Sequence, residues 1–305
     1  MLVIPRNHYL GIALGLMLTL ASLSSRSLAG VCPNGTTLPG VDVSVYQATI
    51  DWTEVAAAGE TFAFARVSDG SFLDTEFDAN WAGIKAAGMV RGAYQYFEPG
   101  EDPTSQANIV ISATGILGPR DLPVVLDAEV TGGQSPATIA SNMQAWINQI
   151  QAGTGRVPII YTAPGFWDGS VDSTAFSANP LWAANWGVTC PTLADGWTNW
   201  AFWQYSDSGT VSGITGAVDL DEFNGSMSDL LALADAPNLN VTPQGSNGIS
   251  VTWSTFATGF VLQQSFTLDS TNWTSVTNVP TIVSNQNQLI LGTSNNHNFY
   301  RLSLP

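Results

Sequence analysis

The stretch that says most about the fold is Pro-Val-Val-Leu-Asp-Ala-Glu at residues 123–129, an apolar β-rich run that ends in two acids. Side chains alternate along a strand, so Asp127 and Glu129 point to the same face. Two carboxyls there are hard to explain as packing, because an unpaired buried carboxylate is costly or takes up a proton. The stretch therefore indicates a strand that carries a functional site at its end.

Similar β-rich runs recur along the chain and alternate with stretches that read as helices. This alternation is typical of parallel strands joined by crossover helices, and eight such strands close a barrel. We expect strands at 41–44, 62–68, 90–97, 123–129, 157–163, 181–186, 201–206 and 218–223. We expect helices at 51–58, 74–87, 103–114, 136–151 and 226–234, with Asp51, Asp74, Ser135 and either Gly225 or Ser226 as caps.

The stretches 164–179 and 187–199 are too irregular for full helices. The predicted fold class is therefore α/β, a distorted (β/α) TIM-like barrel with some outer helices missing. We assign residues 30–235 to this barrel.

The composition changes after the barrel. Residues 235–248 are rich in Asn, Pro, Gly and Gln, and the following segments 249–254, 260–266 and 289–292 alternate as strands do. We expect a linker at 236–248 and a small all-β, sandwich-like module at 249–305. Glycan binding is one interpretation of this module, and a spacer, adhesion or export role is the other.

The first 29 residues have the features of an export signal. They contain no acid, include Arg6 and His8, and continue through an apolar run at 9–23 to Ser27-Leu28-Ala29. We predict a signal peptide at 1–29, cleaved after Ala29, and a secreted or extracytoplasmic protein with no membrane partner after cleavage. The alternative is an uncleaved anchor, for which the apolar run is short.

The chain has two cysteines, Cys32 and Cys190. Two cysteines in an exported protein more often pair than stay free, so we predict a disulfide between them. A zinc site is not expected, because two sulfurs without nearby histidines cannot complete one. We expect no metal and no cofactor.

The overall composition excludes several classes of function. The 305 residues contain 24 acids against 8 Lys and Arg, a formal charge of -16, which argues against a nucleic-acid partner. The two histidines, His8 and His297, lie near opposite ends of the chain. A Ser-His-Asp triad or a multi-histidine metal site therefore has no histidine in the body of the fold. Catalysis must come mainly from carboxyl groups, aromatic side chains and backbone.

Active sites of (β/α) barrels lie at the C-terminal ends of the strands, where Asp42, Asp127, Glu129 and Asp219 are expected. Repulsion from an ionised Asp127 would raise the pKa of Glu129 and keep it protonated for donation to a leaving group. The alternative is that this pair lies on a solvated loop, or pairs with Arg66 or Arg91.

The other two acids also have alternatives. Asp42 could be a turn or cap acid, and Asp219 could be exposed beside Asp221 and Glu222. Asp221 shares a strand face with Asp219, so alternation leaves the choice between them open. Asp69, in Ser-Asp-Gly, is expected to be a turn residue.

Aromatic side chains gather near the same strand ends. Flat aromatic faces suit sugar rings, which favours a polysaccharide groove, whereas the alternative is that they fill the core. We expect Tyr161 and Trp182 to be the best candidates for substrate contact. The set comprises Tyr94, Tyr96, Tyr161, Phe166, Trp167, Trp182, Trp186, Trp203 and Tyr205.

Taken together, the motifs resemble those of the family 25 glycoside hydrolases over roughly residues 40–233. That family consists of lysozymes that cut the β-1,4 bond between N-acetylmuramic acid and N-acetylglucosamine in peptidoglycan. The motifs, in chain order, are Gly-Val-Asp-Val-Ser-Val-Tyr-Gln at 40–47, Ile-Asp-Trp at 50–52, Gly-Ala-Tyr at 92–94, Leu-Asp-Ala-Glu at 126–129, Ile-Tyr-Thr at 160–162, Phe-Trp-Gln-Tyr at 202–205 and Val-Asp-Leu-Asp-Glu-Phe-Asn-Gly at 218–225.

The resemblance implies roles for particular residues. It makes Glu129 the general acid, and it gives Asp127, Asp42 and Asp219 the task of orienting the substrate and stabilising positive charge on the sugar. It also favours Asp219 over Asp221. Substrate-binding residues are expected at Tyr94, Gln95, Tyr161, Trp182 and Gln204.

Gln95 departs from the resemblance, because the third strand of these enzymes commonly reads Tyr-His-Phe and here reads Tyr-Gln-Tyr. The leading hypothesis remains an exported, monomeric muramidase that acts on peptidoglycan glycan strands. One rival is a non-catalytic glycan-binding barrel, and another is a glycosidase for a different acetamido-sugar polymer such as chitin. The C-terminal module loosely resembles a β module appended to exported bacterial enzymes, from Asn-Trp-Thr at 272–274 and Phe-Tyr-Arg-Leu at 299–302.

Overall fold

The computed structural model describes residues 30–33, 35–235, 239–245, 248–254, 260–267, 272–283, 286–292 and 298–303. The predicted signal peptide at 1–29 lies outside these residues. Within the described ranges, no helix is both long enough and apolar enough to cross a membrane.

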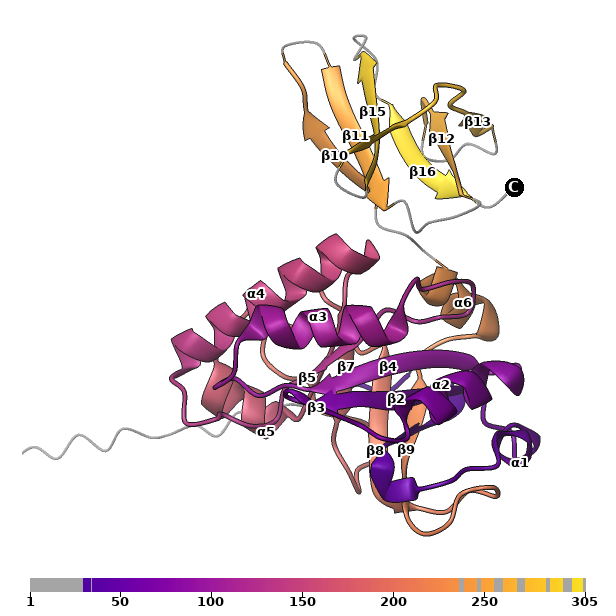
Figure 1. The fold of residues 1–305 in the computed structure, drawn as a ribbon, viewed down its shortest axis with the longest axis vertical. Helices are drawn as coiled ribbons and strands as arrows, with labels where there is room; N and C mark the ends of the chain where they lie inside the picture. Colours follow the sequence, from indigo (N-terminus) through magenta and orange to yellow (C-terminus); the bar gives the residue numbers. More distant parts are fainter. Residues whose placement is uncertain are drawn as a thin grey trace, which may run out of the picture.

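In the described chain, eight strands close into a barrel in the neighbour order β1-β9-β8-β7-β6-β5-β4-β2, with β1 also paired to β2 (Figure 1). The predicted barrel and all eight predicted strand segments are confirmed. A further short strand, β3 (Phe72–Leu73), forms a hairpin with β2. The barrel strands are β1 (Leu38–Val43), β2 (Phe62–Asp69), β4 (Val90–Tyr96), β5 (Val125–Asp127), β6 (Ile159–Thr162), β7 (Leu181–Ala184), β8 (Phe202–Gly209) and β9 (Val218–Phe223).

The last barrel strand runs against its neighbours, so the prediction of parallel strands is wrong for β9. It pairs antiparallel with both β8 and β1. Residues 210–217 join β8 to β9 without a helix, and a short connection can join only antiparallel strands. The reversal puts Asp219, near the start of β9, opposite Asp42, near the end of β1. Both side chains therefore belong to the same mouth of the barrel.

The helices cover the outside of the barrel unevenly. Asp51 caps α1 and Ser135 caps α4, as predicted, through side-chain bonds to backbone N–H groups. Asp74 is not a cap, because α2 begins after Glu76. No helix lies between β7 and β8 in the fully described segment 185–201. The helices are α1 (Trp52–Ala57), α2 (Phe77–Ala86), α3 (Pro103–Thr114), α4 (Pro136–Thr154), α5 (Pro164–Phe166), which continues as a π-helical turn (Trp167–Val171), and α6 (Met227–Asp235).

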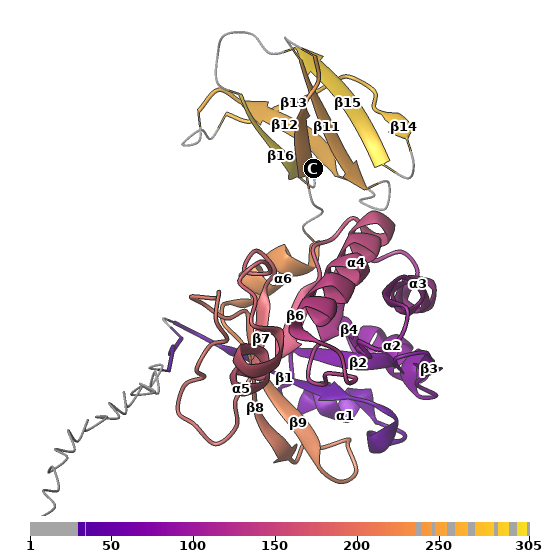
Figure 2. The ribbon, with the colours of Figure 1, turned by 90° about the vertical axis from the view of Figure 1, so that its left-hand side faces the viewer.

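Aromatic rings fill the barrel interior. Phe64 stacks on Trp182 with 4.4 Å between ring centroids, and Phe202 meets Phe64 edge to face at 5.1 Å. Gly92 makes room for this packing, because a Cβ there would lie 2.1 Å from the Phe64 ring. A second apolar layer, which includes Trp146, lies between the strands and α3 and α4, which pack side by side (Figures 1 and 2).

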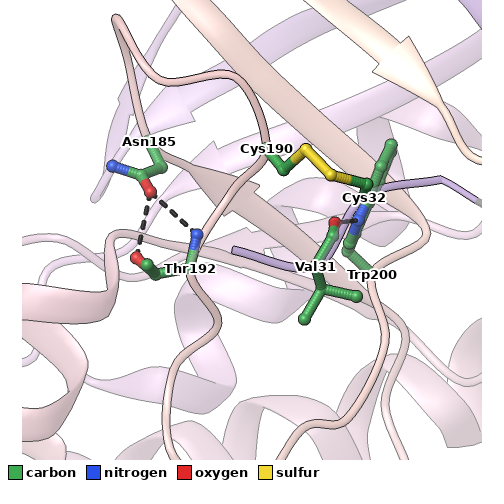
Figure 3. Close-up of a disulfide and its surroundings, with 6 residues drawn as sticks. All are labelled: Val31, Cys32, Asn185, Cys190, Thr192 and Trp200. Carbon is green, nitrogen blue, oxygen red and sulfur yellow. Dashed lines mark hydrogen bonds between the residues drawn. A yellow bond between two sulfur atoms is a disulfide. The ribbon is translucent and has the colours of Figure 1, made fainter. Parts of the chain in front are cut away.

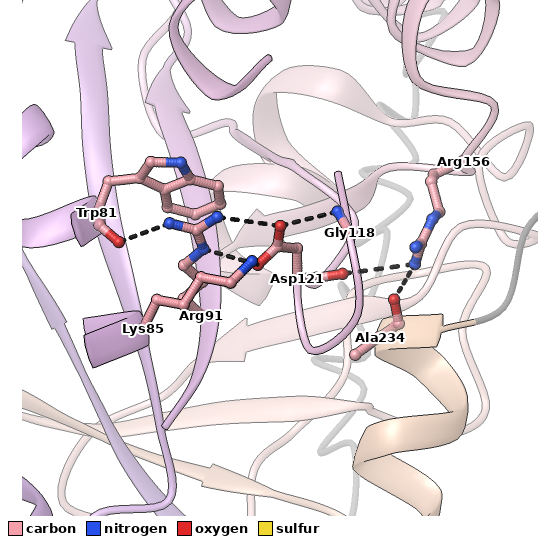
Figure 4. Close-up of polar contacts among 7 residues, drawn as sticks. All are labelled: Trp81, Lys85, Arg91, Gly118, Asp121, Arg156 and Ala234. Atoms are coloured by element: carbon pink, nitrogen blue, oxygen red, sulfur yellow. Dashed lines mark hydrogen bonds and ion pairs between the residues drawn. The ribbon is translucent and has the colours of Figure 1, made fainter. Parts of the chain in front are cut away.

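Buried cations hold the side of the barrel away from the strand-end acids (Figure 4). The Arg91 guanidinium donates to Asp121 from Nε at 2.6 Å and lies 3.6 Å from the centroid of the Trp81 ring. Arg156 donates to the backbone carbonyls of Asp121 and Ala234, which ties the end of α6 to the barrel. These partners occupy Arg91, so it does not pair with Asp127 or Glu129.

The predicted disulfide between Cys32 and Cys190 is present and spans a sequence separation of 158. Beside it, the Val31 carbonyl accepts a hydrogen bond from Trp200 Nε1 at 2.7 Å (Figure 3). Asn185 Oδ1 accepts from both the backbone N–H and the hydroxyl of Thr192 at 2.9 Å. The segment before β1 is therefore fastened to the irregular connection between β7 and β8.

The C-terminal region forms two antiparallel sheets, ordered β10-β11-β15-β14 and β13-β12-β16 (Figure 2). Val251, Trp253, Leu262 and Leu289 are its most buried apolar residues, and they come from both sheets. Strand β10 lies inside the segment 236–248, so the prediction that this whole segment is a linker is wrong. The strands are β10 (Leu239–Pro243), β11 (Gly248–Ser254), β12 (Val261–Ser265), β13 (Thr274–Ser275), β14 (Thr281–Val283), β15 (Gln286–Gly292) and β16 (Phe299–Ser303).

Candidate active site

A cleft of about 320 Å³ opens at the barrel mouth where the parallel strands end. All four acids singled out from the sequence line it, and they come from β1, β9 and the end of β5. Its lining is Asp42, Val43, Ser44, Tyr46, Gln47, Arg66, Asp69, Tyr94, Tyr96, Asp127, Glu129, Tyr161, Trp182, Gln204 and Asp219.

Asp127 and Glu129 differ in exposure although they share a face. Asp127 is the last residue of β5 and is 6% exposed, whereas Glu129 is exposed at the rim. The solvated-loop alternative is therefore wrong for Asp127. Its Oδ1 is buried without a hydrogen-bond partner among the described residues. Arg66 forms its ion pair with Asp74 instead, at 3.0 Å.

The electrostatic environment favours the protonated form of both acids. Burial raises the pKa of Asp127 well above its usual range, and the charge of Glu129 adds to this. The pKa of Glu129 is raised first by its partial removal from water and then by the charge of Asp219. The predicted rise for Glu129 is present, but its charged neighbour is Asp219 rather than Asp127.

On the opposite wall, Gln204 on β8 positions Asp42. Its Nε2 donates to Asp42 Oδ2 at 2.6 Å, while its Oε1 accepts from the Tyr161 hydroxyl and from Trp186 Nε1, both at 2.9 Å. Because two donors hold the Gln204 oxygen, the amide is fixed with its NH₂ group toward Asp42. This network brings together three barrel strands and the half-exposed Trp186 at the rim.

Asp42 and Asp219 also favour their protonated forms. Burial, and then the charge of Asp219, raise the pKa of Asp42 well above its usual range. Burial, followed by the charge of Asp207, raises the pKa of Asp219 to about 6. The cleft therefore gathers carboxyl groups that keep protons at pH values where exposed acids have lost them.

The aromatic side chains divide into two groups. Tyr94, Tyr96, Tyr161 and Trp182 line the cleft. Trp182 is only 1% exposed, so it forms the floor. The remaining aromatics are not part of the lining. Trp186 is half-exposed at the rim, and the others pack elsewhere, in agreement with the core-filling alternative: Phe166, Trp167, Trp203 and Tyr205.

The structure contradicts a direct substrate contact for Gln95. This side chain is fully buried and does not line the cleft. Its Nε2 donates to the Ser68 hydroxyl at 2.7 Å and to the Gly70 carbonyl at 3.1 Å, and its Oε1 accepts from Trp146 Nε1 at 2.6 Å. Along β4, Tyr94 faces into the barrel, so Gln95 points outward to α4. Its role is to join β2, β4 and α4.

Arg66 and Tyr46 belong to the cleft although the sequence reasoning did not assign them to it. Arg66 is the only cation among the described residues of the lining, and its guanidinium lies 5.3 Å from the centroid of the Tyr46 ring. Its Nε bonds to Asp74, and neither terminal nitrogen is hydrogen-bonded within the described chain. Alternation along β2 could have found it, because residue 66 shares a face with Phe62 and Phe64.

Asp69 belongs both to a hairpin and to the cleft lining. It ends β2 and pairs with Phe72 in the hairpin, as expected for a turn, and it also lines the cleft. In the described ranges, no group of three or more His, Cys, Asp and Glu residues is arranged to hold a metal ion.

A closed barrel with carboxyl groups and aromatic rings at one mouth has the architecture and the site chemistry of a glycoside hydrolase. The chain belongs to family 25 of the glycosyl hydrolases, whose family model matches residues 41–214. The family predicted from the motifs, and with it the enzyme class, is thereby confirmed.

Individual relatives agree with this assignment. Lysozyme M1 of Streptomyces globisporus is 39% identical over 209 residues, which are 64% of this chain and 71% of the relative. The N,O-diacetylmuramidase of Arthroderma benhamiae is 28% identical over 72% of this chain and 97% of its own length. The crystal structure of a bacterial lysozyme from Streptomyces coelicolor superposes with a TM-score of 0.63 at 35% identity, covering 66% of this chain and 98% of that chain.

Proposed function

We propose that this protein is a secreted lysozyme that hydrolyses the β-1,4 bond between N-acetylmuramic acid and N-acetylglucosamine in peptidoglycan. The observation that carries the proposal is the convergence of Asp42, Asp127, Glu129 and Asp219 on one cleft. Family membership supports the substrate class. The disulfide supports an oxidising compartment outside the cytoplasm.

Glu129 acts as the general acid in this proposal. It is the exposed member of the acid group, so an incoming glycosidic oxygen can reach it. Its raised pKa keeps the proton available for transfer. As the C1–O bond breaks, this proton passes to the leaving oxygen of N-acetylglucosamine, and Glu129 later recovers a proton from the attacking water.

The three aspartates stabilise the positive charge that develops on the muramoyl ring. Asp127 and Asp42 lie deeper than Glu129, and Asp219 lies across the barrel mouth from Asp127's strand. The negative charge that this group of carboxyls retains stabilises an oxocarbenium-like transition state. Retention can run through a protein carboxylate or through the 2-acetamido oxygen of the substrate, and both routes use the same acid.

Sugar contacts are assigned to Tyr94, Tyr161, Trp182 and Gln204, all of which line the cleft. Tyr94 and Tyr161 supply hydroxyl groups and ring surface above the Trp182 floor. The two terminal nitrogens of Arg66 offer donors to substrate carbonyl or carboxylate oxygens. Binding therefore combines stacking with a few directed polar contacts.

The test compares wild type with Glu129→Gln on purified peptidoglycan, measuring release of reducing ends. The variant should lose activity while its near-ultraviolet circular dichroism stays unchanged. Glu54→Gln, an exposed acid at the start of α1, serves as the matched control and should keep full activity. Wild-type turnover by Glu129→Gln would remove Glu129 as the acid.

Product analysis separates the rival functions. Mass spectrometry should place the new reducing end on N-acetylmuramic acid. Cleavage of chitin oligosaccharides in preference to peptidoglycan would move the assignment to another acetamido-sugar polymer. Peptidoglycan binding by the wild type without any turnover would instead favour a glycan-binding barrel.

A further inference from the structure

Asp221 is a buried acid that the proposed mechanism leaves without a task. It lies two residues beyond Asp219 on β9 and is fully buried, whereas Asp219 is partly exposed at the mouth. Because both face the barrel interior and β9 enters the barrel from the mouth, Asp221 lies one layer below Asp219. Asp221 does not line the cleft.

Only one oxygen of Asp221 is satisfied by a neutral donor. Trp182 Nε1 donates to Asp221 Oδ1 at 2.9 Å. Oδ2 is buried and has no hydrogen-bond partner among the described residues, and no described ion pair includes this residue. A lone buried carboxylate in this position is costly, and a proton on Oδ2 removes the cost.

Asp42 is the neighbour that can accept this proton's hydrogen bond. Burial, and then the charge of Asp42, raise the pKa of Asp221 well above its usual range. Both side chains face the barrel interior from the paired strands β1 and β9, where Asp221 lies two residues beyond Asp219, the partner of Asp42 in the pairing. The Gln204 amide holds Oδ2 of Asp42 in place at 2.6 Å.

Asp219 continues this row of carboxyl groups toward the cleft. It lies directly opposite Asp42 in the pairing of β1 with β9, and both residues line the cleft. Two other titratable groups lie within range of Asp221, the phenols of Tyr161 on β6 and Tyr205 on β8. Burial is the main cause that raises the pKa of each phenol, and the charge of Asp221 is one of several smaller causes. Both phenols stay neutral near pH 7.

We propose that Asp221 is a positioning residue: it carries a proton, donates to Asp42, and Asp42 in turn donates to Asp219. The three carboxyl groups then share one negative charge, which lies at the cleft end, on Asp219. The catalytic consequence of this positioning role rests on the proposed hydrolase function. Deprotonation of Asp221 would reverse the order and draw the remaining proton away from the cleft.

Asparagine at position 221 reproduces the protonated acid. Its Oδ1 can accept from Trp182 Nε1, and its Nδ2 can donate to Asp42. Leucine has a similar size but supplies neither bond. The pair Asp221→Asn and Asp221→Leu therefore separates a neutral donor from an ionised carboxylate and from plain packing.

The first measurement is the pH profile of peptidoglycan hydrolysis. Asp221→Asn should stay within about threefold of wild-type kcat/KM near neutral pH and should keep activity further into the alkaline range. Asp221→Leu should lose at least about tenfold. A loss of more than tenfold in a folded Asp221→Asn would show that the ionised form is required, and wild-type activity in a folded Asp221→Leu would show that no positioning occurs. Either result overturns the proposal.

The second measurement is thermal unfolding, which needs no activity and so stays informative if the hydrolase assignment fails. A pKa that is raised in the folded state makes stability fall as pH increases. Between pH 5 and 9, the thermal unfolding midpoint of the wild type should therefore fall relative to that of Asp221→Asn, by at least about 3 °C. An unchanged difference across this range would mean that Asp221 holds no proton, and the proposal would be wrong.

Discussion

The barrel and the C-terminal β region solve different physical problems. All but one of the 24 acids of the chain precede residue 236, and the region from 236 to 305 contains a single acid, Asp269, and a single base, Arg301, beside its histidine. The barrel buries several carboxyl groups, whereas the buried residues described in the β region are apolar, apart from Ser250 and Ser265. Charge is therefore concentrated where the site is.

This difference shows what a domain needs in order to bury carboxyl groups at a site. The barrel interior has a stacked aromatic core and a second apolar layer under its helices, which together offset the burial of acids such as Asp127. The small β region has only four fully packed apolar residues in its described core. A core of that size could not hold an uncompensated carboxyl group. Changes in the two regions should thus have effects of different kinds.

The largest contrast should come from removing one acid in each region. Glu129→Gln should lower kcat on peptidoglycan by roughly 10²- to 10⁴-fold, because proton donation to the leaving group is lost. Asp269→Asn should leave kcat unchanged. Equal effects of the two substitutions, measured by reducing-end release, would contradict the assignment of catalysis to the barrel.

The next effect concerns the disulfide, which lies wholly within the barrel. Cys32→Ser with Cys190→Ser should lower the free energy of barrel unfolding by about 2 to 5 kcal/mol, because the bridge closes a very long loop. Denaturant titration followed by tryptophan fluorescence measures this change. This double substitution tests the comparison between the two regions. If only the C-terminal β region lost structure, the assignment of the bridge's stabilising effect to the barrel would be wrong.

A smaller effect should follow from the partly exposed Asp219. Its pKa is raised to about 6 in the folded protein, chiefly by burial, so the stability it contributes is full below its ordinary value of 3.8 and is lost as pH rises through 6. Asp219→Asn should therefore be more stable than wild type above pH 6, by about 1 kcal/mol after screening by solvent. Unfolding midpoints at pH 4 and pH 8 measure this, and an advantage larger at pH 4 would contradict it. Activity should fall in the same variant.

The smallest effect should be that of salt. The barrel is strongly acidic and cell walls are often anionic, so we expect binding to a cell wall to be led by shape and aromatic contact. Added salt should leave activity unchanged or raise it slightly by screening repulsion. A steep fall in hydrolysis rate between low and physiological ionic strength would show that attraction of opposite charges drives binding.

The sequence predicted the acids of the site well because strand alternation and strand ends are local signals. Asp127 and Glu129 follow a short apolar run, and Asp42 and Asp219 lie in comparable runs. Their roles stay predictions, but their convergence on one cleft is what the pattern implied. The disulfide was equally accessible, because only two cysteines exist to pair.

Other features depend on contacts distant in sequence and could not be predicted from local pattern. The alternation of apolar and polar residues does not reveal the direction of β9, because it is the same for parallel and antiparallel strands. The resemblance placed Gln95 at the substrate; alternation with Tyr94 could have put it on the outer face of β4, but its partner Trp146, 51 positions away on a helix, could not be predicted locally. The charge that raises the pKa of Glu129 belongs to Asp219, which reaches it only when the barrel closes.

The reversed strand β9 also determines when the site comes into existence during folding. It pairs with β1, so the seam of the barrel joins the first strand of the domain to the last. Contacts between such distant segments form late, because a long loop must close before they repay its entropy. A partly folded chain can contain β5 and its two acids while Asp42 and Asp219 are still apart. Recovery of activity should therefore report the closing of the seam, and no folding intermediate should be able to cut a glycan.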